Sequence, residues 1–227
     1  MKTKMKNSVA KNNLELKDFV KIIKNINKTM EKNVKTLTKI DSNIGDGDHG
    51  TTIARGFKSA SLALEGEKLK DISSALVLTG ETLVASMGGA SGPLFGTFFR
   101  AMGQKVPNKN HVNLEDLCLI FSFAYENLLK ISGAKPGEKT MIDSLDPAVE
   151  SLKTSVAKKD TLEDALNKMV IAAKKGMLAT KNYVAKKGRA KYLKERSLGL
   201  QDAGATSMYL IIKTFYESIF CGKKITK

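Results

Sequence analysis

Apolar residues recur every three to four positions along most of the chain, the spacing that places them on one face of an α-helix. The first run covers 16–30 and the last covers 208–219. Between them, polar or glycine-containing stretches separate further apolar runs at 53–64, 72–87, 94–102, 117–128, 142–152 and 162–177. No segment shows the period-two alternation of a half-buried strand. The pattern therefore predicts an all-α fold of eight helices.

Short connections between successive helices favour antiparallel neighbours, so we expect an up-and-down bundle or barrel. Every second connection then lies at the same end. The connections before the second, fourth, sixth and eighth helices are 41–50, 88–93, 133–139 and 199–204, and they are the richest in glycine and polar residues. We therefore expect one domain with a single functional site at one rim.

The charge balance is strongly basic, with 38 Lys and Arg against 23 Asp and Glu and a formal net charge of +15. Lysine is spread over nearly every predicted helix and loop, whereas the arginines are only Arg55, Arg100, Arg189 and Arg196. Nucleic-acid readers favour arginine, whose planar fork matches phosphates and guanine edges. The pattern indicates a solvated coat that attracts anionic nucleotides rather than a nucleic-acid interface.

The sequence also predicts a cytoplasmic protein. Cys118 and Cys221 lie in apolar helical patterns without metal-binding spacing, as expected of buried thiols in a reducing compartment. The basic N-terminus lacks the apolar core of a signal peptide, and no apolar run is long enough to span a membrane.

The connection 41–50 crowds Asp41, Asp46, Asp48 and His49 into one short loop. Carboxylates this close repel one another unless a cation lies between them. Hard divalent cations, Mg²⁺ above all, take such oxygen ligands and often share them with nucleotide phosphates. The alternative is a solvated glycine-rich turn. Two further glycine-rich segments favour the metal interpretation.

Familiar motifs do not account for this loop. Its glycines match G-x-G-x-x-G, but the aspartates between them would face a pyrophosphate, and no βαβ unit surrounds them. Counted from Asp46 as an EF-hand, the twelfth position is Phe57 instead of a bidentate Glu. A Walker A sequence is also missing.

The segment 88–93, Gly-Gly-Ala-Ser-Gly-Pro, precedes the predicted fourth helix. Small residues let a ligand approach the backbone, and amide groups at a helix start favour a phosphate. Ser91 is not a nucleophile elbow, because Pro93 stands where that motif needs glycine. The alternative is an ordinary connector with Ser91 as the N-cap. Thr51 and Thr52, which open the second helix, either cap it or touch a phosphate.

A long polar segment, 188–206, separates the last two predicted helices. Such segments are more often functional than filler. Arg189 in this segment either pairs with a phosphate, forms a surface ion pair or caps the seventh helix. His49 is expected to hydrogen-bond a ligand or a metal-bound water, and His111 to lie in a loop.

Four segments, IGDGDHGTTIARGF, GGASGPLFGTFF, PGEKTMIDSLDPA and KGRAKYLKERSLGLQDAGATS, occur in that order. Together they resemble the L subunit of bacterial dihydroxyacetone kinase and, more broadly, the nucleotide-binding domain of that kinase family. The resemblance implies an eight-helix antiparallel barrel with the nucleotide at one rim. It divides the chain into a basic N-terminal extension (1–13), a single DhaL-type nucleotide-binding domain (14–222) and a basic tail (223–227).

By this resemblance Asp41, Asp46 and Asp48 bind two Mg²⁺ ions that bridge the diphosphate of ADP or ATP. Three carboxylates and a diphosphate carry about six negative charges, more than one divalent ion offsets. Ala203 stands where the family usually has proline, and the loop 132–136 is a residue shorter around Gly133. No catalytic residue is assigned. The implied nucleotide contacts are His49, Gly50, Thr51, Thr52, Ala90, Ser91, Gly133, Met141, Arg189, Asp202, Ala203 and Gly204.

The resemblance also implies a division of labour among three subunits. The L subunit keeps ADP as a bound coenzyme, which a phosphohistidine on the M subunit rephosphorylates. The phosphoryl group then passes to dihydroxyacetone on the K subunit. Because no segment resembles the K domain, we expect a kinase subunit that acts by positioning and charge neutralisation and needs its partners. Association as a homodimer is left open.

Two alternatives remain at this stage. The first is the nucleotide domain of an ATP-dependent kinase of the same superfamily, similar to fatty-acid kinase. The second is a non-enzymatic basic helical adaptor or nucleic-acid binder, which would hold no nucleotide and would lose affinity steeply with salt.

Overall fold

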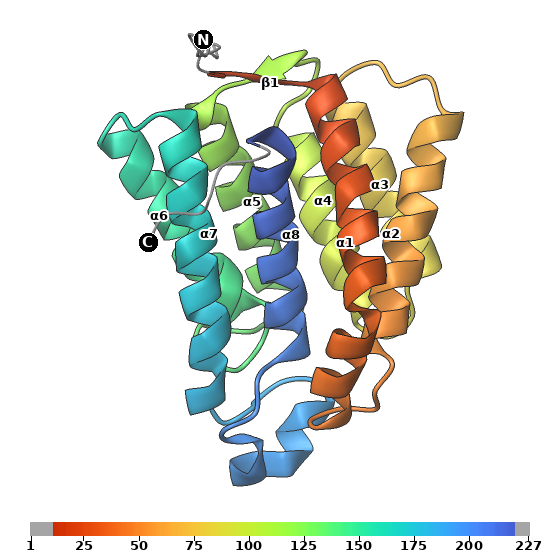
Figure 1. The fold of residues 1–227 in the computed structure, drawn as a ribbon, viewed down its shortest axis with the longest axis vertical. Helices are drawn as coiled ribbons and strands as arrows, with labels where there is room; N and C mark the ends of the chain where they lie inside the picture. The colour runs from red at the N-terminus through yellow and green to blue at the C-terminus, as the bar shows by residue number, and fades with distance from the viewer. Residues whose placement is uncertain (1–10, 221–227) are drawn as a thin grey trace, which may run out of the picture.

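Residues 11–220 are described by a computed structural model, in which eight α-helices run up and down the long axis (Figure 1). Each helix packs on the next along the chain, and the last packs on the first. The predicted all-α up-and-down arrangement is therefore confirmed, and the contact between α8 and α1 closes it into a barrel. The helices are α1 (Leu16–Ser42), α2 (His49–Gly66), α3 (Ile72–Ser86), α4 (Ser91–Gln104), α5 (Leu114–Ser132), α6 (Ile142–Ala157), α7 (Leu162–Ala179) and α8 (Ala203–Ile219).

Several short elements were not expected. At the end where α1 begins, β1 (Leu14–Glu15) pairs antiparallel with β2 (His111–Val112). Strands of two residues are too short to leave a period-two pattern. Between α7 and α8 the chain forms two 3₁₀ helices, η1 (Thr180–Asn182) and η2 (Arg189–Ser197).

The outer limits of the predicted domain fall partly outside the described residues. Apart from 11–13, the predicted extension lies beyond them, as do Cys221 and the predicted tail. The boundaries at 14 and 222 therefore remain predictions. Within residues 11–220 no helix combines the length and apolar character needed to cross a bilayer.

Local chemistry fixes where several helices begin and end. The Asp71 carboxylate accepts a 2.7 Å hydrogen bond from the Ser74 amide at the start of α3, and Asn113 does the same for α5. These side chains satisfy amides that have no partner inside the helix. Gly133 is the C-cap of α5, and its φ of 56° is the left-handed conformation typical of a helix C-terminus.

Aromatic rings form a continuous edge-to-face chain through the barrel interior. It runs from Phe19 on α1 through Phe215 on α8 and Phe121 on α5 to the phenylalanines of α4 and α2, with ring centroids 5.3–5.9 Å apart. Edge-to-face contacts add stabilisation beyond the burial of apolar area. The chain links five of the eight helices, so the core holds the rims of the barrel in fixed positions.

Helices α3 and α4 approach closely because glycines face each other across their contact. A Cβ placed on Gly80 would lie 2.6 Å from both the Arg100 amide nitrogen and the Gly96 carbonyl oxygen. Backbone atoms of a packed helix cannot move aside as a flexible side chain can. This contact brings the connection between α3 and α4 into its position at the rim.

We therefore expect Gly80→Ala to destabilise the fold by about 1–3 kcal/mol, the usual penalty for overpacking a core. Gly66→Ala is the matched control, because a Cβ at that helix end meets nothing within 4 Å. Urea unfolding followed by circular dichroism checks this prediction. Equal midpoints for the two variants would contradict the close backbone contact.

Candidate functional site

A cavity of about 590 Å³ opens at the end of the barrel where α2, α4, α6 and α8 begin. All four connections expected at one rim contribute residues to its wall. Its volume falls in the range of small-molecule sites. A wider, more open depression of about 700 Å³ lies at the opposite end, near Glu15 and His111, without clustered carboxylates or glycine-rich loops.

The cavity receives the N-termini of four helices, which begin at His49, Ser91, Ile142 and Ala203. Amide groups in the first turn of a helix have no intrahelical partner, and the helix dipole adds partial positive charge there. An antiparallel barrel directs every second N-terminus to the same rim. The arrangement therefore favours an anionic ligand such as a phosphate.

The predicted acidic cluster forms beside these helix starts. Asp41 lies in the last turn of α1, Asp46 in the following loop, and Asp48 at the N-cap of α2. One carboxylate oxygen from each lies within 4.8 Å of the others. Oxygen ligands from three carboxylates suit a hard divalent cation.

Backbone geometry brings the three aspartates together. The Asp41 carbonyl accepts a 2.9 Å hydrogen bond from the Ile44 amide, and its carboxylate accepts one of 3.2 Å from the His49 amide. A Cβ on Gly45 would lie 2.4 Å from the Asp41 carboxylate, so a larger residue there would displace that carboxylate. Gly47, at a φ of 75°, adopts the left-handed conformation that glycine tolerates best.

A positive charge already lies against this cluster. The Arg189 guanidinium, at the start of η2, forms an ion pair of 2.9 Å with the Asp46 carboxylate. Of the alternatives open for Arg189, the structure therefore contains the surface ion pair. The pair is exposed, with 72% of the Arg189 side chain accessible, so it adds little to stability. Its existence fits a group of carboxylates that draws cations.

His49 lies behind the cluster and does not reach into solvent. Its Nε2 atom is 2.7 Å from the Ser207 hydroxyl of α8. Burial lowers the pKa of His49, although the carboxylates of Asp41 and Asp48 oppose this shift. In this structure the imidazole joins α2 to α8, and the ligand contact of His49 stays a prediction.

Eleven of the fifteen predicted site residues line the cavity, and four do not. Gly50 packs α2 onto α1, because a Cβ there would lie 2.3 Å from the Val34 carbonyl oxygen. The Thr51 hydroxyl donates to the Asp48 carbonyl, and Thr52 is buried in α2. Gly133 ends α5 between two lining residues. The eleven predicted residues that line the cavity are Asp41, Asp46, Asp48, His49, Ala90, Ser91, Met141, Arg189, Asp202, Ala203 and Gly204.

Ser91 is not the N-cap of α4, the alternative role considered for it from the sequence. The N-cap of α4 is Ala90, and Ser91 is the first helical residue. Gly89, directly before them, has a φ of 61°, and a Cβ there meets nothing within 4 Å. The loop backbone is therefore open on this side, as a phosphate-binding connection requires.

Two buried charged residues of the site, Lys139 and Asp143, were not predicted from the sequence. Lys139 lines the cavity with only 2% of its surface exposed, and Asp143 lies behind it in the first turn of α6. The Asp143 carboxylate accepts hydrogen bonds from the amides of Gly137 and Thr140 and so shapes the α5–α6 connection. Lysine is so frequent in this chain that Lys139 carried no signal of its own.

Asp202 caps α8 at the cavity wall by accepting a 2.6 Å hydrogen bond from the Ala205 amide. Burial raises the pKa of its carboxyl to about 7, and the neighbouring carboxylates of Asp143 and Asp41 add to the shift. Lys139 and the Ala205 hydrogen bond act in the opposite direction. Near neutral pH, Asp202 therefore gains or loses a proton readily.

A barrel with converging helix N-termini and a triad of carboxylates offers the groups that a phosphate and a divalent cation require, and the comparisons show its family. A model of the DAK2 domain matches residues 43–217, so the chain belongs to the DAK2 domain family. It is 41% identical over 177 residues to the "PEP-dependent dihydroxyacetone kinase, ADP-binding subunit DhaL" of Escherichia coli, covering 78% of this chain and 84% of that protein.

Two further relatives are informative. The ADP-binding subunit DhaL of the PTS-dependent dihydroxyacetone kinase of Lactococcus lactis is 36% identical over 193 residues, which is 85% of this chain and 92% of that one. The crystal structure of dihydroxyacetone kinase from C. freundii with AMP-PNP and Mg²⁺ superposes with a TM-score of 0.67 at 26% identity. That match covers 96% of this chain but only 36% of the C. freundii chain.

The raised pKa of Asp202 predicts how the stability of the nucleotide-free protein depends on pH. Between the ordinary value of 3.8 and about 7, the folded state holds a proton that the unfolded chain releases. Stability from this group is therefore complete below about pH 4 and is lost as pH rises through about 7. We expect Asp202→Asn to reduce the fall in melting temperature between pH 5 and 8 by at least about 3 °C. Thermal melts in a chelator check this, and parallel pH profiles would contradict it.

Proposed function

We propose that this chain is the nucleotide-binding subunit of a dihydroxyacetone kinase that depends on the phosphotransferase system. It holds Mg-ADP, receives a phosphoryl group from a phosphohistidine on an M-type subunit, and passes it to dihydroxyacetone on a K-type subunit. The observation that carries the proposal is the meeting of the acidic cluster with a glycine-rich helix start in one cavity. Similarity to the two DhaL subunits over most of their length supports it.

The cluster fits the proposed metal ions. Asp41, Asp46 and Asp48 would hold two Mg²⁺ ions, because three carboxylates and a diphosphate leave too much negative charge for one. Mg²⁺ bound there would neutralise the charge of the diphosphate and orient it. Arg189, which pairs with Asp46 in this structure, would then be free to turn toward the phosphates. The C. freundii kinase, solved in complex with AMP-PNP and Mg²⁺, supports the pairing of nucleotide with metal.

The chain itself contributes binding and orientation. Backbone amides at Ala90 and Ser91 lie at the start of α4, where small neighbours admit a phosphate. Met141 and Leu94 give the same cavity an apolar wall, which suits a nucleobase. Phosphoryl transfer needs little covalent chemistry from protein, so positioning and charge neutralisation suffice.

The surface around the cavity favours acidic partners. Exposed basic side chains gather on the segment between α7 and α8, near the largely exposed Tyr192. Complementary charge speeds protein association and fixes its orientation. We propose that the K-type and M-type subunits approach this rim in the cytoplasm, while association of two copies stays a prediction. The basic residues are Lys181, Lys186, Arg189, Lys191, Lys194 and Arg196.

The second candidate is an ATP-dependent kinase domain. It is favoured by the fold match to part of the C. freundii kinase. The two candidates share the nucleotide site and differ in the phosphoryl donor. A non-enzymatic adaptor finds less support, because the family match and the carboxylate triad both point to nucleotide chemistry.

Removing one carboxylate tests the metal site. Asp46→Asn or Asp48→Asn should weaken Mg-ADP binding at least about 100-fold, because each carboxylate offsets metal charge, while the melting temperature stays within a few degrees. Asp160→Asn, in the connection between α6 and α7 at the opposite rim, is the control. Calorimetric titration of nucleotide-free protein measures the affinities. Binding within about twofold of wild type in both variants would refute the metal assignment.

A reconstituted reaction separates the two candidate donors. Phosphorylation of dihydroxyacetone should require K-type and M-type partners with phosphoenolpyruvate as the ultimate donor, and ATP should support little beyond one turnover. The assay follows dihydroxyacetone phosphate over time with each donor. Sustained turnover with ATP and the K-type partner alone would favour the second candidate and leave the nucleotide site in place.

A further inference from the structure

Lys139 is an unusual residue for a cavity wall. Only 2% of it is exposed, and its φ of 62° lies in the left-handed region that non-glycine residues rarely adopt. Burying an ammonium group and holding a strained backbone both cost free energy. Two such costs at one position indicate a function that an apolar residue would not serve.

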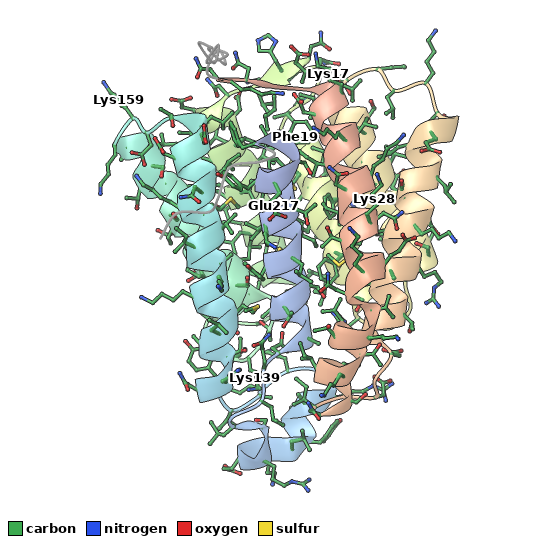
Figure 2. All side chains as sticks on the ribbon, viewed as in Figure 1. Lys17, Phe19, Lys28, Lys139, Lys159 and Glu217 are labelled. Carbon is green, nitrogen blue, oxygen red and sulfur yellow. The ribbon has the colours of Figure 1, made fainter. Side chains whose placement is uncertain are left out.

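The Lys139 ammonium group donates hydrogen bonds to three backbone carbonyls. Two of them, at 2.5 Å and 3.2 Å, belong to Thr180 and Tyr183, where the chain leaves α7. The third belongs to Leu200, just before α8 begins. Figure 2 places Lys139 at the lower end of the barrel, beside the segment that connects α7 and α8. The Lys139 side chain is therefore hydrogen-bonded to both ends of a segment that is distant from it in sequence.

That segment, 180–202, closes on itself at the point where Lys139 holds it. The Asp202 amide donates to the Thr180 hydroxyl at 3.1 Å, and the Gly199 amide donates to the Lys181 carbonyl at 2.8 Å. The Lys139 ammonium group lies between the two ends of the resulting loop, where it contacts the Thr180 and Leu200 carbonyls. We call 180–202 the rim segment, because its exposed part covers the end of the barrel.

The rim segment carries two predicted ligand contacts, Arg189 and Asp202. Its own apolar side chains, Ala185 and Ala190, pack against Ile44 of the acidic loop. The position of the segment therefore sets the distance between the arginine and the carboxylate cluster. The Lys186 amide also donates a 3.2 Å hydrogen bond to the Glu138 carbonyl, so Glu138 and Lys139 together join the segment to the connection between α5 and α6. Lys139 is the residue whose side chain contacts both ends of the segment.

We propose that Lys139 is a positioning residue for the nucleotide site, one that holds the rim segment so that Arg189 and Asp202 face the acidic loop. The inference rests on the proposed function for its ligand, Mg-ADP. The attachment of the rim segment to Lys139 is observed directly, through the three hydrogen bonds to backbone carbonyls. Burial lowers the pKa of Lys139, while the carboxylates of Asp202 and Asp143 counter this shift and help to keep the group charged.

The test compares nucleotide-free wild-type protein with Lys139→Met, which keeps the side-chain volume but removes the donors. We expect amide hydrogen exchange in 181–200 to rise at least about tenfold, while exchange in α1 to α5 stays within about twofold. We expect the affinity for Mg-ADP to fall at least about tenfold. Lys135→Met, an exposed lysine of the same connection, is the control and should change neither quantity.

Lys139→Arg separates positioning from general stability. Its guanidinium retains several donors, so exchange and affinity should recover to within about threefold of wild type. Lys139→Gln, which is uncharged but still polar, replaces the Met variant if that variant does not fold. Unchanged exchange in 181–200, equal acceleration in every helix, or no recovery with arginine would each overturn the proposal. If wild-type protein itself fails to bind Mg-ADP, the proposed function is wrong. The exchange data alone then test whether Lys139 holds the rim segment in position.

Discussion

Closure of the helical ring is the constraint on which the rest of the molecule depends. Each connection reverses the chain between helices that pack together, so helix direction alternates, and an even number of helices lets α8 close the ring against α1. The alternation sends the starts of α2, α4, α6 and α8 to one rim, together with the connections before them. A field that favours anions therefore arises from topology, before any charged side chain contributes. The chain of packed phenylalanine rings in the core fixes the relative positions of five of the helices.

The site built on that frame is electrostatically strained. Three carboxylates lie within 4.8 Å of one another, Asp202 is half-buried, and Lys139 is buried nearby. Such an arrangement is less stable than an apolar one would be, which is common where binding requires preorganised charge. The Arg189 pair and the three carbonyl contacts of Lys139 lessen the strain. Cations and an anionic nucleotide would relieve it further.

Periodicity was sufficient to predict the helices and their order, because the core positions repeat every three to four residues over long runs. Grouping of the four glycine-rich connections followed from antiparallel packing alone. The acidic loop was recognisable because its carboxylates are unusually dense in a basic chain. The sequence thus predicted the frame and most of the cavity wall.

The remaining features depend on contacts between distant segments. Lys139 contacts Thr180 and Leu200, which are 41 and 61 residues away in sequence. The residues next to Lys139 in sequence therefore give no sign of these contacts. Gly50 matched a ligand-binding pattern, yet the structure shows that it also lets α2 approach the backbone of α1. The pairing of β1 with β2 involves too few residues to leave a pattern. In each case the decisive neighbour is far away in sequence.

The central claim is that the carboxylate cluster and the helix starts together retain a nucleotide as a coenzyme. The most direct measurement is mass spectrometry of the small molecules released when the freshly purified, Mg²⁺-containing protein is denatured. The account predicts ADP at close to one molecule per chain. Release of no nucleotide, or of a nucleotide in only trace amounts from correctly folded protein, would contradict it.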